Sequence, residues 1–283
     1  MTNLKFSGHE SFHCRPFWLK KGYDHVLAKN AFNDQAGIQM GVGRNMVPAI
    51  RFWMKAMGML NEDDQLSPLA DALFAEKGFD PFLEDEGTLW LLHYQLCSKK
   101  YSTIYSLIFR ELRKEKPDFS KVHLVNKVEE IDEKQSSNIV GKDFSVFTRT
   151  YHKDHGANKE DSYSGLFSEL GLLREMEKDS NGNQLYHIQN KRANALPWQV
   201  LLYCILENEE YGDSVDIKSF YTEDFGVGNI FALSKDDLDS KLVEMQMEGK
   251  KFGIVYKNEA GERVLQFTKG KPDKMKLLED YYG

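Results

Sequence analysis

The opening stretch from Phe6 to Val26, FSGHESFHCRPFWLKKGYDHV, gathers side chains that could do chemistry. His9 and His13 are four positions apart, so a helix would place both imidazoles on one face, as in many metal sites. The spacing H-E-x-x-x-H differs from the H-E-x-x-H of zinc peptidases, and no third ligand is marked, so no structural zinc is expected. A fixed polar loop that caps the first helix is the alternative, and a surface facing phosphate is another. If the protein cleaves DNA, the expected catalytic residues are His9, Glu10 and His13, with Mg²⁺ or Mn²⁺ activating water.

Two further patterns look chemical but have simpler explanations. His93 and Cys97 are four apart on an apolar helix, without a third ligand, so a packed core histidine is predicted. Asp118, Asp132 and Lys134 formally match a loose nuclease pattern that needs its carboxylates on neighbouring strands. The segment between them has helical periodicity, so a chance match is predicted.

The amino-acid composition indicates in which compartment the protein works and what kind of partner it meets. The three cysteines are far apart and form no C-x-x-C pair, which favours a reducing cytoplasm. No apolar run approaches the roughly 18 residues of a membrane span, so no membrane partner is expected. The net charge is −7, yet residues 1–60 hold eight basic and three acidic side chains. This asymmetry suggests that the N-terminal part meets a polyanion while the rest does something else.

A helix-turn-helix is predicted over residues 33–60. Asn33 would cap a short helix ending near Gly41, and a second helix would begin near Asn45, with Pro48 in its first turn. Its apolar stripe would be Val47, Ile50, Met54 and Met57. A basic face would point outward, although such modules also bind proteins. The predicted contacts with duplex DNA are Arg15, Lys20, Lys21, Arg44, Asn45, Arg51 and Lys55.

The neighbouring segments extend this module. A first helix is predicted from Arg15, with Phe17, Trp18 and Val26 or Leu27 facing the core. A short wing follows the second helix, and then a helix capped by Ser67 with Pro68 at its first position.

Three helices followed by a hairpin recur along the chain, which predicts a mostly α (α+β) fold of tandem winged-helix-like modules around a central helical spine. The modules would span 1–116, 117–190 and 191–283, with later hairpins turning at Asn181-Gly182, as a type I′ turn, and at Ala260-Gly261. The third helix of the last module is rich in acids, including Asp236, Asp237 and Asp239. Phosphate would repel such a helix, so it is expected to pack against protein.

The chain resembles a bacterial family long catalogued as a domain of unknown function, over roughly Lys5 to Phe267. The resemblance rests on the motifs FSGHESF, GVGRNMVPAIRFW, LSPLADALF, GTLWLLHYQL and FSVFTRTY. That family includes SspB, the DNA-nicking component of single-strand DNA phosphorothioation systems used in phage defence. The resemblance implies a DNA-binding partner of an ATP pyrophosphatase/sulfurtransferase and a cysteine desulfurase, and it carries over no catalytic residue.

The sequence therefore predicts a cytoplasmic DNA-binding protein and leaves its chemistry open. One reading is a component that nicks DNA to allow sulfur insertion. The alternative is a non-enzymatic winged-helix adaptor or regulator that recruits sulfur-transfer partners. A pure protein scaffold is a third reading, and it predicts no salt-dependent DNA binding.

Overall fold

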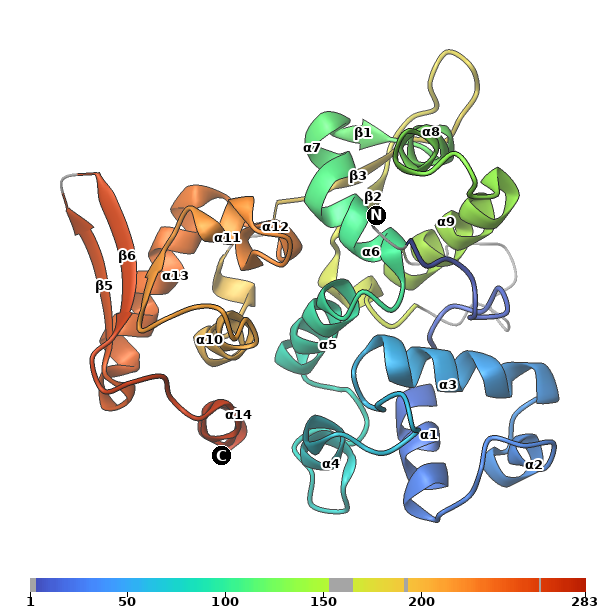
Figure 1. Cartoon of the computed structure of the whole chain (residues 1–283), viewed down its shortest axis with the longest axis horizontal. Coiled ribbons are helices and arrows are strands. Elements are labelled where there is room, and N and C mark those ends of the chain that lie inside the picture. Colours follow the sequence, from blue (N-terminus) through green and yellow to red (C-terminus); the bar gives the residue numbers. More distant parts are fainter. Residues whose placement is uncertain (1–3, 153–164, 191–192, 260) are drawn as a thin grey trace. The chain divides into compact units, whose positions relative to one another are not determined.

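The computed structural model describes residues 4–152, 165–190, 193–259 and 261–283 (Figure 1). The chain forms two compact units, one ending at Gln189 and the other beginning at Asn190. The predicted boundary after residue 116 lies inside the first unit. The fold is mostly helical with small antiparallel sheets, which is an α+β class. No helix in the described ranges is long and apolar enough to span a membrane.

The first unit begins with the predicted helix-turn-helix and continues through a helical spine into a small sheet. Its elements are α1 (Trp18–Leu27), α2 (Ala36–Met40), η1 (Arg44–Met46), α3 (Val47–Ala56), α4 (Pro68–Phe74), α5 (Glu86–Ser98), α6 (Thr103–Leu107), η2 (Ile108–Leu112), α7 (Arg113–Glu115), β1 (Asp118–Phe119), α8 (Lys121–Ile131), α9 (Ser137–Tyr151), η3 (Ser168–Leu170), β2 (Leu173–Glu175) and β3 (Tyr186–Ile188).

The helix-turn-helix follows most of its local sequence signals. The predicted cap at Asn33 is wrong, because α2 begins at Ala36 with Gln35 at its N-cap position, while the Asn33 side chain accepts from the Gln35 amide. α2 ends at Gly41, whose φ of 62° lies in the left-handed region that favours glycine. Pro48 lies in the first turn of α3, where the helix needs no amide donor from it. The predicted stripe of Val47, Ile50, Met54 and Met57 is buried. α1 and α3 pack side by side, and a Cβ on Gly22 of α1 would lie 2.8 Å from Met54 (Figure 1).

The predicted core face of α1 is partly wrong. Trp18 is buried as expected, but Phe17 and Leu27 are 59% and 57% exposed, and Val26 is half-buried. The buried face includes Leu19, which lies about 100° from Trp18 around the helix. Phe17 lies about 100° the other way, and Leu27, nine residues on, lies about 180° from Trp18, so neither can share that face.

After α3 the chain makes a tight turn, residues 61–65, closed by a bridge between Leu60 and Leu66. α4 then begins as predicted, because the Ser67 side chain accepts a hydrogen bond from the Ala70 amide and Pro68 takes the first helical position. The spine follows. α5 is buried nearly all round, and α6, η2 and α7 run on as one helix interrupted by a π-helical turn.

The sheet of the first unit has strand order β1-β3-β2, with both pairs antiparallel. Its hairpin loop differs from the predicted type I′ turn. Gly182 has a φ of 81°, but Asn181 does not have the positive φ that a type I′ turn requires there. Asp179 shapes the loop instead, since its carboxylate accepts hydrogen bonds from the amides of Asn181 and Asn183.

The second unit repeats the order helix, strand, helices, hairpin. Its elements are η4 (Ala193–Ala195), α10 (Trp198–Leu206), β4 (Ser214–Asp216), α11 (Ser219–Thr222), α12 (Val227–Ile230), α13 (Lys235–Glu248), η5 (Lys250–Phe252), β5 (Ile254–Glu259), β6 (Glu262–Phe267) and α14 (Lys274–Tyr282). Its strand order, β4-β6-β5, matches that of the first sheet. The last helix, α14, packs against α10. Of the predicted turn residues, Ala260 lies outside the described residues.

Most of the acids of α13, the helix that the sequence led us to expect to pack against protein, bond to groups of the same unit. Asp239 pairs with Arg263 at 2.8 Å and accepts from the Tyr256 hydroxyl at 2.7 Å. Glu244 pairs with buried Lys241. The remaining partners are Ser234 for Asp237 and the Trp198 indole for Glu248. The outward stripe is instead Asp236, Ser240, Val243 and Met247.

Candidate functional site

The loop that carries the predicted catalytic residues is held in an unusual backbone conformation. Ser7, Gly8, Glu10 and Ser11 all have positive φ, at 73°, 101°, 48° and 63°. Such conformations cost free energy in non-glycine residues and persist only where the surroundings impose them. Gly8 is required here twice over, since a Cβ would also lie 2.7 Å from the Phe52 ring.

Long-range contacts hold this loop in place. Asp143 of α9 accepts from the Ser7 amide with both carboxylate oxygens, at 2.9 and 3.2 Å. Arg149, two turns further along α9, donates to the Ser11 carbonyl at 2.7 Å. The Trp53 indole of α3 donates to the Phe12 carbonyl at 3.1 Å. The loop therefore joins the helix-turn-helix to α9, as a fixed polar segment.

His9 points into the protein. It is 3% exposed, stacks against Trp53 and meets the Phe52 ring edge-on. The Ser11 amide donates to its Nδ1, so the ring proton belongs on Nε2. Nε2 lies 3.1 Å from Oδ1 of Asp143, which is 1% exposed, without the alignment of a hydrogen bond. His9 and Asp143 thus form a buried polar pair that anchors the loop.

The three predicted catalytic side chains do not converge. Glu10 is exposed, His13 is half-buried, and His9 is turned inward. Cys14 next to them is fully buried, and burial raises the pKa of its thiol, so it is no ready nucleophile. Within the ranges the structure describes, no three His, Cys, Asp or Glu side chains gather as a metal site. The residues therefore do not fit a metal held by protein ligands alone.

Sequence reasoning missed Asp143 and Arg149. Asp143 had a visible signal, because it follows Val140 by three residues and stands on the apolar face that Val140, Phe144 and Phe147 form on α9. A carboxylate on a buried face is costly unless it is paired, so it implied a partner. Arg149 had no comparable signal.

The predicted DNA-contacting residues on and near α1 have local partners. Arg15 is half-buried, with its guanidinium 5.5 Å from the Trp18 ring centre. Lys20 pairs with Asp24 one turn along α1. Lys21 donates to the Met40 carbonyl at 2.8 Å, which ties α1 to the end of α2.

The basic face around α3 is only partly as predicted. Arg44 and Asn45 are exposed, and Arg44 pairs at 2.8 Å with Asp34, which is also exposed. Arg51 is exposed and contacts both carboxylate oxygens of Asp64, through Nη2 at 2.8 Å and Nε at 2.9 Å. Lys55 does not project outward: it is 8% exposed, donates to the Glu62 carbonyl and pairs with Asp64 at 3.0 Å.

Asp64 thus lies between two cations of α3, and the turn 61–65 folds onto the helix through it. Partial burial raises the pKa of Asp64, but hydrogen bonds from Arg51 and Lys55 outweigh this effect and leave that pKa lowered. The hydrogen bond to Asp64 in turn raises the pKa of Arg51. Of the predicted DNA contacts on and near α3, the exposed ones are therefore Arg44, Asn45 and Arg51.

The two other chemical patterns have structural explanations. His93 is fully buried, with Nδ1 2.7 Å from the Tyr151 hydroxyl and 3.8 Å from the Cys97 sulfur, so the predicted core histidine is confirmed. Asp118 and Asp132 lie beyond opposite ends of the 11-residue helix α8, which is roughly 16 Å long. They therefore cannot hold one metal ion together.

Comparison with known proteins gives consistent matches. A family model described as "Protein of unknown function (DUF4007)" matches residues 6–282. Two solved structures resemble this chain over 98% of its length and 88% of theirs, at 26% identity: a magnesium ion-bound SspB crystal structure with a TM-score of 0.84 and an SspB crystal structure with a TM-score of 0.82. No curated protein matches. With the family model covering nearly every residue, the chain belongs to the DUF4007 family, and it has the fold of SspB.

Proposed function

We propose that this protein is a DNA-binding component of a bacterial DNA phosphorothioation system and that it contacts duplex DNA through the helix-turn-helix of α2 and α3. The observation that carries the proposal is the exposed group of Arg44, Asn45 and Arg51 around the start of α3. Arginine contacts phosphates and guanine edges, and asparagine suits adenine edges. The similarity to SspB supports the link with phosphorothioation.

The repeated sheet order supports a finer proposal about architecture. In both sheets the first strand pairs with the second strand of the hairpin, and the hairpin follows a helical region: α8, α9 and η3 in the first unit, and α11, α12, α13 and η5 in the second. This is the order expected of a winged helix. We read the chain as three such modules, the first with the turn 61–65 in place of a full wing.

The chemistry is proposed in two forms. A nicking component would use Glu10, which the loop presents to solvent. Phosphate and water would supply most of the ligands of its Mg²⁺ or Mn²⁺ ion. An adaptor would only hold DNA for an ATP pyrophosphatase/sulfurtransferase and a cysteine desulfurase. The inward orientation of His9 favours the adaptor, because a general base must reach the proton that it takes.

The experiment is duplex binding by the full chain at several salt concentrations. Arg44→Ala with Arg51→Ala should weaken binding and shallow the slope of log K against log salt by about 0.9 for each lost phosphate contact. Lys77→Ala is the matched control, since Lys77 is also exposed but lies after α4. An unchanged slope in the double variant would refute this DNA-binding face.

Supercoiled plasmid separates the two chemical forms. With Mg²⁺ or Mn²⁺, a nicking protein relaxes the plasmid, whereas an adaptor binds it and leaves it supercoiled.

A further inference from the structure

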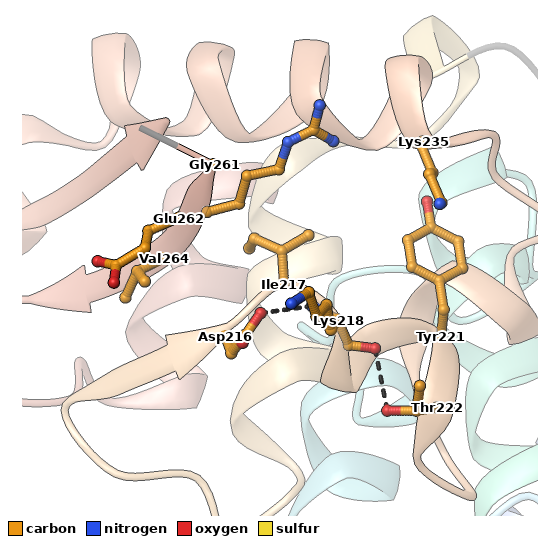
Figure 2. A pocket seen from close by; sticks show the side chains of 10 residues that line it. Asp216, Ile217, Lys218, Tyr221, Thr222, Lys235, Gly261, Glu262 and Val264 are labelled. Atoms are coloured by element: carbon orange, nitrogen blue, oxygen red, sulfur yellow. Dashed lines mark hydrogen bonds between the residues drawn. The ribbon is translucent and has the colours of Figure 1, made fainter. Parts of the chain in front are cut away.

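The C-terminal unit contains a groove of about 690 Å³, apart from the residues considered as a functional site above (Figure 2). Three segments enclose it: the end of β4 with α11, the first residue of α13, and the start of β6. Its volume falls within the roughly 300–1,000 Å³ of small-molecule sites.

The lining combines cations with apolar and aromatic surface. Lys218 and Lys235 are both exposed, and neither pairs with a carboxylate of the described residues. Ile217 and Val264 supply apolar surface, and the Tyr221 ring forms part of the wall. A few polar groups set in apolar surface are typical of a ligand site.

Tyr221 is fixed rather than adaptable. Its hydroxyl donates to the Ser234 carbonyl at 2.9 Å, just before α13. The ring also packs closely on Gly228, where a Cβ would lie 2.5 Å from it. Figure 2 shows the ends of Lys235 and Tyr221 pointing toward one another, while the Glu262 carboxylate lies at the opposite end of the groove. An anion would therefore meet Lys235 beside a rigid aromatic ring.

Three acids lie in or near the groove: Asp216 and Glu262 line it, and Asp239 pairs with a lining residue. Asp239 is neutralised by Arg263, which also lines the groove. Asp216 accepts from the Lys218 backbone amide at 2.8 Å, which fixes the turn between β4 and α11. Among the described residues, Lys218 and Lys235 are the lining cations without a carboxylate partner, so they are the groups that an anion would meet.

We infer that this groove binds a phosphate ester of nucleotide size, either a free nucleotide or the end of a nucleic-acid strand. Lys218 and Lys235 contact the phosphate, because charge-assisted hydrogen bonds to phosphate are the strong ones available here. The Tyr221 ring lies beside the base, since every base offers a face for stacking on an aromatic side chain. The inference does not depend on the DNA-binding face of α3.

The test is calorimetric titration of the full chain with AMP, ADP, adenosine and a 5′-phosphorylated single-stranded hexanucleotide at low salt. Adenosine, which lacks phosphate, should bind at least about tenfold more weakly than AMP. The double variant Lys218→Gln and Lys235→Gln should lose about tenfold or more in AMP affinity, the equivalent of one charge-assisted hydrogen bond. Both side chains are exposed, so the variant should stay folded, as circular dichroism will check.

Lys276→Gln is the matched control, because Lys276 is an exposed lysine of α14 outside the groove, and it should bind as the unaltered chain does. Tighter binding of the hexanucleotide than of AMP would identify a strand end as the ligand, and the reverse would identify a free nucleotide. Two results would overturn the inference: no saturable binding of any phosphate-bearing probe at millimolar concentration, or equal binding by the double variant. Duplex affinity, measured in parallel, reports separately on α3.

Discussion

The carboxylate of Asp64 offers the sharpest test of the α3 surface, because it forms salt bridges with Arg51 and Lys55 and so competes with any phosphate that would bind there. Asp64→Asn removes the charge and keeps the shape, and asparagine tolerates the φ of 59° at this position. A carboxylate about 7 Å from a phosphate in water costs about 0.6 kcal/mol, or about threefold in affinity. Freeing Arg51 for one further phosphate contact should also steepen the salt slope by about 0.9.

The same variant should lose some stability. The exposed salt bridge with Arg51 contributes about 0.5 kcal/mol. The bond to Lys55 contributes about 1 kcal/mol more, because the buried Lys55 ammonium would still donate to the Glu62 carbonyl in the variant. Because the pKa of Asp64 is lowered in the folded state, this contribution is present above the pKa of the unfolded carboxyl. It should disappear as the pH falls through the folded pKa, so the two proteins should converge in stability in acid.

The assay is fluorescence anisotropy with a labelled duplex at about 50 and 150 mM salt, together with urea unfolding between pH 7 and pH 3. Asp63→Asn is the control, since it removes the same charge from the same exposed turn without breaking a salt bridge. We expect Asp64→Asn to bind the duplex about threefold or more tightly, and Asp63→Asn to gain less. Unchanged or weaker binding by folded Asp64→Asn would refute the reasoning that this face meets phosphate.

Four other outcomes are expected. Asp143→Asn should destabilise the first unit by about 1–3 kcal/mol in urea unfolding, because the buried carboxylate holds the Ser7 amide and faces His9; an unaffected midpoint would show that the pair is not the anchor. Gly8→Ala should cost at least about 1 kcal/mol more than Gly182→Ala, since both glycines have positive φ but only Gly8 has a neighbour within 4 Å. Glu10→Gln should change the free energy of unfolding by less than about 0.5 kcal/mol and should abolish any Mg²⁺-dependent nicking, so persistent nicking would exclude Glu10 as the catalytic carboxylate. A shortened chain ending at residue 190 should fold alone and keep its duplex affinity in anisotropy, and a loss of affinity despite native circular dichroism would show that the second unit contributes.

Local signals predicted the helix-turn-helix well because its determinants lie within a few residues of one another. Gly41 ends α2, Pro48 starts α3, and Ser67 caps α4, each through a bond or a φ value that its own residue type favours. The same reasoning recognised His93 as a core residue, since the apolar residues around it are neighbours on one helix.

The features that the sequence did not predict depend on contacts between residues far apart in the chain. Lys55 is correctly placed one turn after Arg51, but its burial arises because the turn carrying Asp64 folds back onto α3. His9 meets a carboxylate 134 positions away, and no spacing rule relates the two. The partners of the α13 acids could not be named from the sequence either, because Arg263, Lys241 and Trp198 come from the inner face of α13 or from other elements. Charge counted along a chain cannot show which charges are neutralised.

The loop of left-handed residues has a consequence for biosynthesis. Ser7 to Ser11 are synthesised before the groups that impose their conformation, because Asp143 and Arg149 follow about 130–140 residues later. At roughly 5–20 residues per second, the Ser7–Ser11 segment must wait on the order of 7–30 s for them. Until then the segment has no reason to adopt its strained form, so the helix-turn-helix is exposed on the growing chain without its last support. Chaperones that engage this protein should therefore bind it before α9 emerges and release it afterwards.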